Sequence, residues 1–382
     1  MARKWKAVVI GAGGSQAQAM LRALARGGAT HDWLAVDRAW RPEAERAAQS
    51  MGFITKQMDA LADAGQLDEL LSQSELVVNM AGPYYRTGTA ILDRAIANKA
   101  NYLDISDDAD VTIPMLTRNA AAEAAGISAL IGMGSSPGTT NILIRAAIDK
   151  LGPVDDVDIY WTVDLADMTN AAVRHFWHCF NLVDSDGSTH DVAGWDQLEF
   201  RDIDFPDPVG RQRLVRLAHP EPITVPKYLP VKRASNFGGL NPEEALITGW
   251  CLAHIADERR TKGKLTDAAV DLFLHYRDQR AGAARIGSGL VIDIHTNGDG
   301  LRFASGSDGG MDDSTGIPAA VGAILLMQGR IDRKGVFPPE IVSPKEFFSV
   351  LRDVSIGGGG LTLSSLKNGQ AGDRMRIRDL LA

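Results

Sequence analysis

The chain has 382 residues, of which 45% are hydrophobic and 23% are charged, and its formal net charge is −8 at pH 7. This length allows about two or three domains with large buried cores. The acidic balance, without a dense run of lysine or arginine, argues against a nucleic-acid partner. Cys179 and Cys251 are too few for a disulfide framework, so we expect a cytoplasmic protein.

The N-terminal segment "MARKWKAVVIG" passes from a short basic start directly into an apolar run. A signal peptide needs a longer apolar region, of about 7–15 residues, and a small-residue cleavage site. The run therefore predicts a first strand. Nothing in the sequence resembles a membrane anchor, so we expect no membrane partner.

Strand and helix signals then alternate through the first third of the chain. "AVVIGAG", residues 7–13, is an apolar strand that ends in glycines, and residues 15–28 follow with helical spacing of apolar side chains. The same pattern predicts further strands and helices, in chain order, at 33–38, 42–52, 53–59, 61–74, 75–83, 87–100, 101–106, 112–126 and 128–134. This repeated alternation predicts an α/β fold with a doubly wound parallel sheet, a Rossmann domain.

The pattern changes after about residue 135, where longer mixed segments begin. Residues 154–165, 288–298 and 300–307 alternate polar and apolar side chains, as strands of a half-exposed sheet do. The helical pattern returns over 314–331 and 343–354. The glycine-rich segment 355–373 predicts a loop or a partly ordered tail.

A glycine-rich turn lies between the first strand and the first helix. Gly11, Gly13 and Gly14 allow a tight turn and bring backbone N–H groups and the positive helix end close to a pyrophosphate, with Ser15 at the helix start. The third glycine of the G-x-G-x-x-G pattern is replaced by Gln16, which weakens the packing half of the motif. The phosphate-binding half remains, so we expect a dinucleotide cofactor.

Asp37 follows the second strand, 26 residues after Gly11, where a carboxylate can accept hydrogen bonds from the adenosine ribose. Its charge favours NAD, because it would repel a 2′-phosphate. Arg38 and the nearby Arg41 could instead turn toward such a phosphate, which leaves NADP open. Asp59, at the end of the third strand, is also expected beside the cofactor.

Two loops leave the carboxyl ends of later strands, where ligands bind in such sheets. They are "NMAGPYYRTG", residues 79–88, and "GMGSSPGTTN", residues 132–141. The expected cofactor contacts in them are Ala81, Gly82, Pro83, Ser136 and Pro137, and the expected substrate contacts are Tyr84, Tyr85, Arg86 and Asn141.

These segments resemble a known family. "IGAGG", "AGPYYRTG", "ANYLDIS", "GMGSSPGTTN" and "TGIPAAVGAILLMQGRIDRKGVFPPEIVSPKEFFSVL" resemble the saccharopine dehydrogenase-like oxidoreductases, which include saccharopine reductase, lysine 6-dehydrogenase and carboxynorspermidine dehydrogenase. The resemblance covers about the first 145 residues and roughly 315–352. The chain departs from the family at Gln16 and across 185–285, so the substrate cannot be carried over.

The resemblance implies a Rossmann domain, a second α+β domain inserted in it, and C-terminal helices that return to the Rossmann domain. We expect a dinucleotide-binding domain at 1–137, a substrate and dimerisation domain at 138–314, and the return with a tail at 315–382. It further implies hydride exchange between a nicotinamide and a carbon that bears nitrogen, in an amino-acid-like or polyamine-like small molecule, and a homodimer. Ser136, Pro137, Gly138 and Asn141 match the family's loop beside the nicotinamide.

"FWHCFNL" looks like the segment that crosses the substrate pocket of lysine 6-dehydrogenase, which places His178 there. A histidine suits proton transfer near neutrality, and the arginine fork suits a substrate carboxylate, which makes Arg86 and Arg174 candidates. His178 could equally be a core histidine, and either arginine could simply form surface ion pairs. Further expected substrate contacts are Trp177 and Asp104, although Trp177 could be core and Asp104 a helix cap.

His175, His178 and Cys179 lack a second ligand cluster, so we expect no metal. The sequence therefore predicts an NAD(P)-dependent oxidoreductase acting on a C–N bond. Two alternatives remain, a C–O dehydrogenase on the same scaffold and a nucleotide-binding regulatory protein without catalysis.

Overall fold

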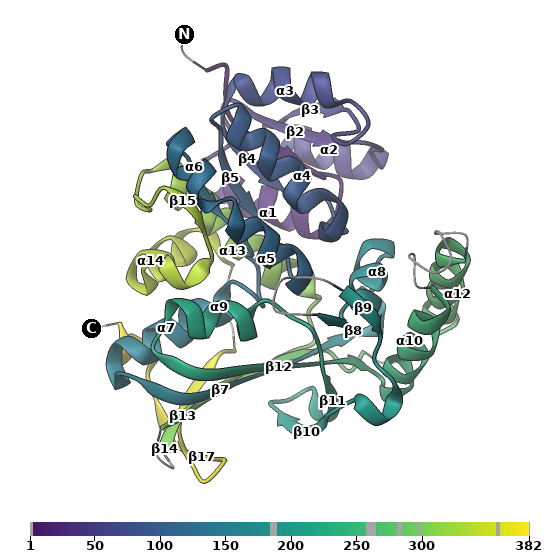
Figure 1. Ribbon diagram of the computed structural model, residues 1–382, viewed down its shortest axis with the longest axis vertical. Coiled ribbons are helices and arrows are strands. Elements are labelled where there is room, and N and C mark those ends of the chain that lie inside the picture. Colours follow the sequence, from purple (N-terminus) through teal and green to yellow (C-terminus); the bar gives the residue numbers. More distant parts are fainter. Residues whose placement is uncertain are drawn as a thin grey trace. The chain divides into compact units, whose positions relative to one another are not determined.

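The structure is a computed structural model that describes residues 3–183, 189–256, 265–280, 285–296, 299–356 and 360–381. The chain separates into two compact units, whose elements are labelled in Figure 1. Unit 1 contains residues 1–107, 111–142 and 312–357, and unit 2 contains residues 108–110, 143–311 and 358–382.

Unit 1 is built on a seven-stranded sheet in the order β15-β6-β5-β4-β1-β2-β3, in which every pair of neighbours is parallel. Its strands are β1 (Trp5–Ile10), β2 (Trp33–Asp37), β3 (Ile54–Gln57), β4 (Ser74–Asn79), β5 (Asn101–Asp104), β6 (Ser128–Leu130) and β15 (Gly335–Phe337). The predicted doubly wound sheet is confirmed. The short edge strand β15 was outside the prediction, because three residues are too few for a periodicity signal.

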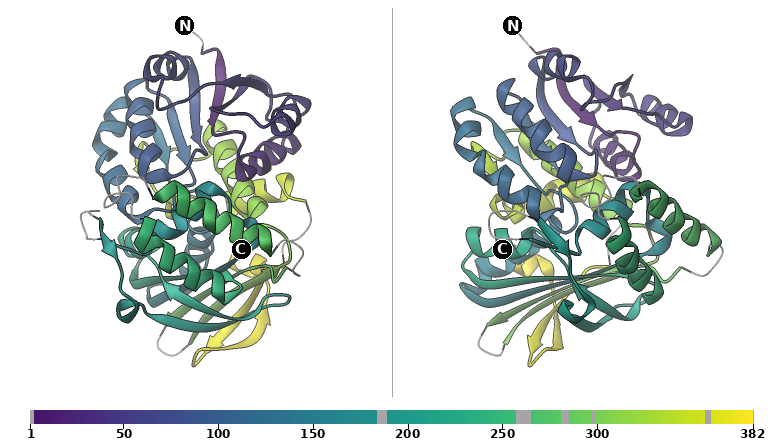
Figure 2. Two further views of the ribbon diagram at one scale, coloured as in Figure 1. Left: turned by 90° about the vertical axis from the view of Figure 1, so that its right-hand side faces the viewer. Right: turned by 45° about the vertical axis from the view of Figure 1, so that its right-hand side comes forward.

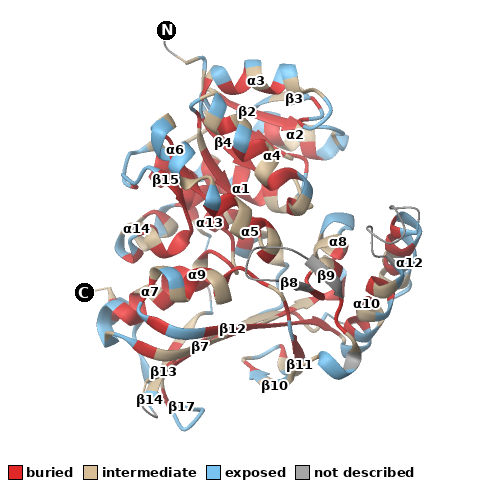
Figure 3. Ribbon diagram, viewed as in Figure 1, coloured by how far each residue is buried: buried red, intermediate tan, exposed pale blue. Residues whose placement is uncertain are grey.

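Helices cover both faces of this sheet, as the views of Figure 2 show. Those of unit 1 are α1 (Ser15–Arg26), α2 (Pro42–Ser50), α3 (Ala64–Ser72), α4 (Tyr84–Ala97), α6 (Asn119–Ala125), α13 (Met311–Met327) and α14 (Pro344–Val354). Apolar side chains of α1, α13 and α14 form one cluster with the strands. The C-terminal helices therefore complete the core of the N-terminal unit, whose central strands are mostly buried in Figure 3, whereas the edge strand β3 is not.

The single helix predicted over 112–126 is divided into α5 (Ala109–Thr117) and α6. The carbonyl of Pro114 accepts a hydrogen bond from the Arg118 guanidinium at 3.0 Å, and the Arg118 N–H donates to Met115 one residue further on. A side chain has thus replaced the i to i+4 backbone bond, and α5 ends there.

Unit 2 is built on an eight-stranded sheet in the order β10-β11-β12-β7-β13-β14-β16-β17. Its strands are β7 (Val154–Asp164), β10 (Phe200–Phe205), β11 (Gly210–Arg216), β12 (Val231–Asn241), β13 (Ser288–Thr296), β14 (Asp299–Ser307), β16 (Thr362–Lys367) and β17 (Gln370–Met375). β7 and β12 are parallel, and the other neighbours are antiparallel. A separate small pair is formed by β8 (Asn181–Val183) and β9 (Thr189–Val192).

The prediction of a loop or tail at the glycine-rich end is wrong for residues 362–375, which form the hairpin β16–β17. Asn368 and Gly369, which join the strands, both have positive φ, at 50° and 76°. This is the backbone of a two-residue hairpin turn, which an Asn-Gly pair favours. The Asn-Gly pair was the signal in the sequence that the glycine-rich reading overlooked.

Helices of unit 2 pack on this sheet. They are α7 (Thr139–Leu151), which begins in unit 1, α8 (Asn170–His178), α9 (Glu221–Tyr228), α10 (Glu243–Ala256) and α12 (Thr266–Gln279). α8, α10 and α12 share one apolar cluster that contains Phe176, Trp177 and Phe273. In the described part of the chain, no helix is long and apolar enough to cross a membrane.

Candidate functional site

The glycine turn between β1 and α1 has the geometry of a phosphate-binding turn. Gly11 has φ +79°, and a Cβ there would lie 2.8 Å from the backbone of Ala81 at the end of β4. A Cβ on Gly13 would lie 3.0 Å from the Asp37 carboxylate. Gly14 precedes α1 and carries no side chain that could cap it. The N-terminal N–H groups of α1 are therefore open to an anion.

Gln16 occupies the position of the missing third glycine, and its backbone lies close to another helix, α13. A Cβ on Gly316 of α13 would collide with the backbone oxygen of Gln16 and would lie 2.7 Å from the Met20 nitrogen. α13 can thus approach the first turns of α1 only because residue 316 is glycine. Ser15 is also tied to α13, because its hydroxyl donates to Asp312 at 2.7 Å.

Asp37 lies at the carboxyl end of β2 and is bonded on both oxygens. The Gly13 N–H donates to Oδ2 at 2.8 Å, and the Ala39 N–H donates to Oδ1 at 2.9 Å. Each carboxylate oxygen can accept a further hydrogen bond, so ribose hydroxyls could still donate to Asp37. Arg41 donates to the Gly13 carbonyl at 3.1 Å, while Arg38 is exposed.

Asp59 follows β3 and is exposed. Its Oδ1 accepts the N–H groups of Leu61 and Ala62, at 3.0 and 3.1 Å. In this structure, the side chain closes the turn before α3.

The loop from Ala81 to Pro83 is fixed by Asn79 and Thr87. Asn79 Oδ1 accepts the Ala81 N–H at 3.1 Å, and the Thr87 hydroxyl donates to the Ala81 carbonyl at 2.5 Å. The Gly82–Pro83 peptide bond is cis. The two hydrogen bonds hold the Ala81 backbone at the carboxyl end of β4.

Tyr84, Tyr85 and Arg86 occupy the first turn of α4. Tyr84 is buried, Tyr85 is half-buried, and Arg86 is exposed. The Arg86 guanidinium lies 5.8 Å from the centre of the Tyr85 ring, within reach of a cation–π contact.

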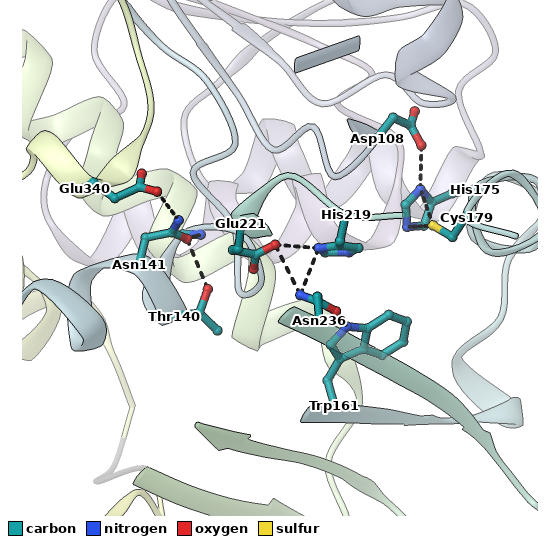
Figure 4. A network of polar contacts seen from close by, with 11 residues as sticks. Asp108, Thr140, Asn141, Trp161, His175, Cys179, His219, Glu221, Asn236 and Glu340 are labelled. Carbon is teal, nitrogen blue, oxygen red and sulfur yellow. Dashed lines mark hydrogen bonds and ion pairs between the residues drawn. The ribbon is translucent and has the colours of Figure 1, made fainter. Parts of the chain in front are cut away.

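The second loop, residues 132–141, folds back on itself. A Cβ on Gly138, which has φ +126°, would collide with Gly134, and the Gly134 N–H donates to the Pro137 carbonyl at 3.0 Å. Asn141 is completely buried, accepts the Gly138 N–H at 2.7 Å and donates to Glu340 at 2.9 Å (Figure 4). Ser136 stays half-buried at the tip of the loop, beside the buried Pro137.

Asp104 links the strands beneath both loops and has no exposed surface. Its Oδ1 accepts the N–H groups of Gly132 at 2.7 Å and Ser106 at 3.1 Å, and its Oδ2 accepts the Tyr102 hydroxyl at 2.7 Å. The Asn79 amide in turn donates to Tyr102 at 3.3 Å. Burial raises the pKa of Asp104 to about 6, against the lowering effect of its hydrogen bonds, chiefly that from Gly132.

This pKa predicts how stability should depend on pH. Because the folded-state pKa lies above the unfolded value of 3.8, the protonated form favours folding, and that stability is lost as the pH rises through about 6. Asp104→Asn imitates the protonated acid. We expect the free energy of unfolding of the variant, relative to the wild type, to rise by about 2 kcal/mol between about pH 4 and pH 7. Urea titrations at both pH values would measure it, and a constant difference would contradict the expectation.

The sequence candidates in unit 2 lie on α8. Trp177 is 5% exposed and packs edge-on against Phe273, with ring centres 5.9 Å apart, inside the apolar cluster of α8, α10 and α12. Arg174 forms an ion pair with Asp267 on α12 and donates to Asn170 at 2.9 Å. Both side chains therefore have packing roles within unit 2.

Both ring nitrogens of His178 have partners. Nε2 lies 3.0 Å from Asp110 Oδ2, and the Asn181 amide nitrogen lies 3.1 Å from Nδ1. Burial lowers the pKa of His178, but the hydrogen bond to Asp110 and the charges of Asp108 and Asp110 outweigh it, so the pKa is raised.

A further polar group in unit 2 was missed by the sequence analysis. His219 and Glu221, in "AHPEP" before and at the start of α9, are buried together with Asn236 of β12 (Figure 4). His219 Nδ1 lies 2.6 Å from Glu221 Oε2. The only local signal is a histidine two residues before a glutamate at a helix start. Nothing local to the sequence shows that both are buried.

Comparison with known proteins supports the site in unit 1. Residues 7–130 match the family model described as the saccharopine dehydrogenase NADP binding domain. Carboxyaminopropylagmatine dehydrogenase of Synechocystis sp. is 23% identical over 352 residues, which cover 82% of this chain and 84% of that protein. Carboxynorspermidine synthase of Vibrio alginolyticus is 22% identical over 349 residues, which cover 79% and 82%.

Two solved structures share the fold. Apo saccharopine dehydrogenase (L-Glu forming) from Saccharomyces cerevisiae superposes with a TM-score of 0.64 at 14% identity, over 94% of this chain and all of that chain. Homospermidine synthase from Legionella pneumophila, solved in complex with NAD, has a TM-score of 0.59 at 9% identity, over 97% and 93% of the two chains. The similarity thus extends through both units.

Proposed function

We propose that the chain is an NAD(P)-dependent oxidoreductase of the saccharopine dehydrogenase type and that it acts on the C–N bond of an amino-acid-like or polyamine-like substrate. The names of its two sequence relatives support this, since they describe carboxylated polyamines. The observation that carries the cofactor assignment is the open glycine turn beside Asp37. We propose CH–NH or CH–NH₂ groups as the donors.

The residues of unit 1 fit a nicotinamide dinucleotide. In this proposal the N-terminal N–H groups of α1 and the glycine turn hold the pyrophosphate, and Asp37 accepts the adenosine ribose hydroxyls. We propose that Gln16, Arg38 and Asp59 also contact the cofactor. The loops at Ala81–Pro83 and Ser136–Pro137 are proposed as further cofactor contacts. When bound, the nicotinamide supplies the hydride acceptor or donor. The protein must then bind and orient the substrate and handle one proton.

Asp37→Ala tests cofactor choice. The substitution removes the negative charge that disfavours a 2′-phosphate and leaves Arg41 nearby, so NADH should bind more weakly and NADPH relatively better. We expect the ratio of the two dissociation constants to shift toward NADPH by about tenfold or more, which corresponds to roughly 1.4 kcal/mol. Fluorescence titration would measure both constants. If the wild type prefers NADPH and the variant binds it worse, Asp37 has another role.

On the substrate side, we propose that Arg86 binds a carboxylate, since it is exposed and carries a planar fork of donors. We also propose six further residues as part of the substrate pocket, either in contact with the substrate or behind the residues that contact it. They are Tyr84, Tyr85, Asp104, Asn141, Arg174 and Trp177. An amine must be neutral before hydride can leave its carbon, which calls for a base. His178 is the candidate that the sequence offers, and it would have to give up a contact with Asp110 or Asn181 to take a proton.

We also propose a cytoplasmic homodimer in which unit 2 carries the substrate and dimerisation surfaces, with domain limits near residues 137 and 314. Light scattering coupled to size-exclusion chromatography would measure the oligomeric state. A monomer at micromolar concentration would contradict the dimer.

The proposed function is tested in two steps on the full chain. Titration with NADH and NADPH measures cofactor binding. A panel of amino acids, diamines and carboxyalkylated polyamines with NAD⁺ or NADP⁺, and of aldehyde–amine pairs with the reduced cofactors, measures turnover at 340 nm. Turnover of α-hydroxy acids alone would support a C–O dehydrogenase, and binding without any turnover would support a regulatory protein.

A further inference from the structure

A buried imidazole–carboxylate pair lies in unit 2, beside the apolar cluster of α8, α10 and α12. His219 is 3% exposed, and Glu221 and Asn236 have no exposed surface. Leu217 and Leu240, in the neighbouring cluster, show that apolar side chains fill this region. Burying such polar groups costs free energy that apolar side chains would avoid. The arrangement is therefore a candidate for a functional site.

The hydrogen bonds fix the orientation of every group. The Trp161 indole N–H, which can only donate, donates to Asn236 Oδ1 at 2.7 Å. The amide nitrogen of Asn236 must then face Glu221 and His219, and it lies 3.2 Å from both Glu221 Oε2 and His219 Nδ1. Trp161 reaches Asn236 because the residue paired with it in β12 is Gly238, and a Cβ there would collide with the indole ring.

Glu221 determines the tautomer of His219. An ionised carboxylate only accepts, so the hydrogen between Nδ1 and Oε2, which are 2.6 Å apart, belongs to Nδ1. The other nitrogen, Nε2, then carries a lone pair. Glu221 lies in the first turn of α9, where the helix dipole favours its negative charge. A carboxylate that orients an imidazole in this way makes it a general base.

We infer that His219 is the residue that accepts and returns the proton at the substrate nitrogen, with Glu221 and Asn236 as positioning residues. The inference rests on the proposed function. In this step an N–H bond of the substrate ammonium breaks, a bond forms between that proton and His219 Nε2, and the electron pair stays on the neutral amine. In the reverse direction, His219 returns the proton to the nitrogen.

His219 suits this step better than His178. Glu221 engages only Nδ1 of His219, whereas Asp110 and Asn181 engage both nitrogens of His178. Among the described titratable groups near His219 are Glu221 from α9 and His175 from α8, and Cys179 lies against His175. The ring of His175 lies edge-on at 6.2 Å, with Asp108 behind it.

The tautomer can be tested without turnover. Long-range ¹H–¹⁵N spectra of the full-length protein, compared with those of His219→Gln, identify the His219 signals. We expect a neutral ring with its hydrogen on Nδ1. A hydrogen on Nε2 would overturn the inference, because that nitrogen could not accept a proton.

Kinetics with an amine that the wild type oxidises test the role. His219→Gln should lower kcat/KM by about 10²–10⁴-fold. Glu221→Gln keeps the hydrogen bonds but removes the charge, so it should lower kcat/KM by about 10-fold or more, mainly through kcat. NADH affinity should not change in either variant. His295→Gln, on β13, is the matched control and should behave as the wild type.

The outcomes separate the two proposals. If the wild type oxidises no amine, the proposed function fails, and the role of His219 fails with it. If the wild type is active and His219→Gln keeps its activity, or only His178→Gln loses it, the role of His219 alone is refuted.

Discussion

Gly13→Val is expected to abolish binding of NADH and NADPH while unit 1 stays folded. The Cβ of the new side chain would lie 3.0 Å from the Asp37 carboxylate and 3.5 Å from Trp40, and its two methyl groups would fill the space that a pyrophosphate needs. The same side chain would push on Asp37, which accepts the Gly13 N–H at 2.8 Å. We expect the dissociation constants to rise by at least about 100-fold, which corresponds to roughly 2.7 kcal/mol.

Fluorescence titration would measure the affinity, and circular dichroism would show that the fold is kept. Gly65→Val is the matched control, because Gly65 is exposed on α3 and a Cβ there meets nothing within 4 Å. Gly13→Ala adds a smaller group at the same place and should give an intermediate loss. Unchanged affinity in Gly13→Val would refute the assignment of the turn as the cofactor site.

Gly316→Val is expected to destabilise unit 1 by about 3 kcal/mol or more. The new Cβ would collide with the Gln16 carbonyl and would lie 2.7 Å from both the Met20 nitrogen and the Ala19 Cβ. These are mostly backbone atoms of α1, so neither helix can yield by changing a rotamer. The first turn of α1 should also shift, and cofactor affinity should fall with stability.

Gly322→Ala on the same helix is the control for this prediction. Its Cβ would approach side-chain atoms of Met133 and Leu103, at 2.7 and 2.9 Å, which can move more easily than backbone. Urea denaturation of the two variants would give the comparison. A loss of less than about 1 kcal/mol in Gly316→Val would show that α13 does not depend on glycine to approach α1.

Local patterns in the sequence were sufficient for six of the seven strands in the sheet of unit 1 and for its glycine turn. Apolar strands alternate with helices there. Apolar side chains recur every two residues in a strand and about every 3.6 residues in a helix, so the sequence indicates the type of each element. Gly11, Gly13 and Asp37 follow strands that are adjacent in the sheet, so their meeting is implied once β1 and β2 are parallel neighbours. The hairpin β16–β17 could also have been predicted from local sequence, because the pair Asn368 and Gly369 favours a two-residue turn.

Other features were decided by contacts between residues far apart in the chain. Gly316 lies against the backbone of Gln16 across 300 residues, and nothing near either position indicates the contact. The sequence predicted Asp104 and Trp177 as substrate contacts. Both side chains are buried in the structure, and burial depends on which other elements pack around them, so it could not be predicted from the neighbouring residues in the chain.

The sequence by itself determined the fold class of unit 1, the position of the glycine turn and the family resemblance, because these depend on short segments whose backbone geometry is set by nearby residues. Only the tertiary structure decided that His219, Glu221 and Asn236 are buried together. His219 and Glu221 are two residues apart, but the pairing of β7 with β12 brings Trp161 and Asn236 to them, and the residue opposite Trp161 is a glycine. Strand register and burial are properties of the whole unit, so the orientation of that imidazole could not be read from its neighbours in the chain.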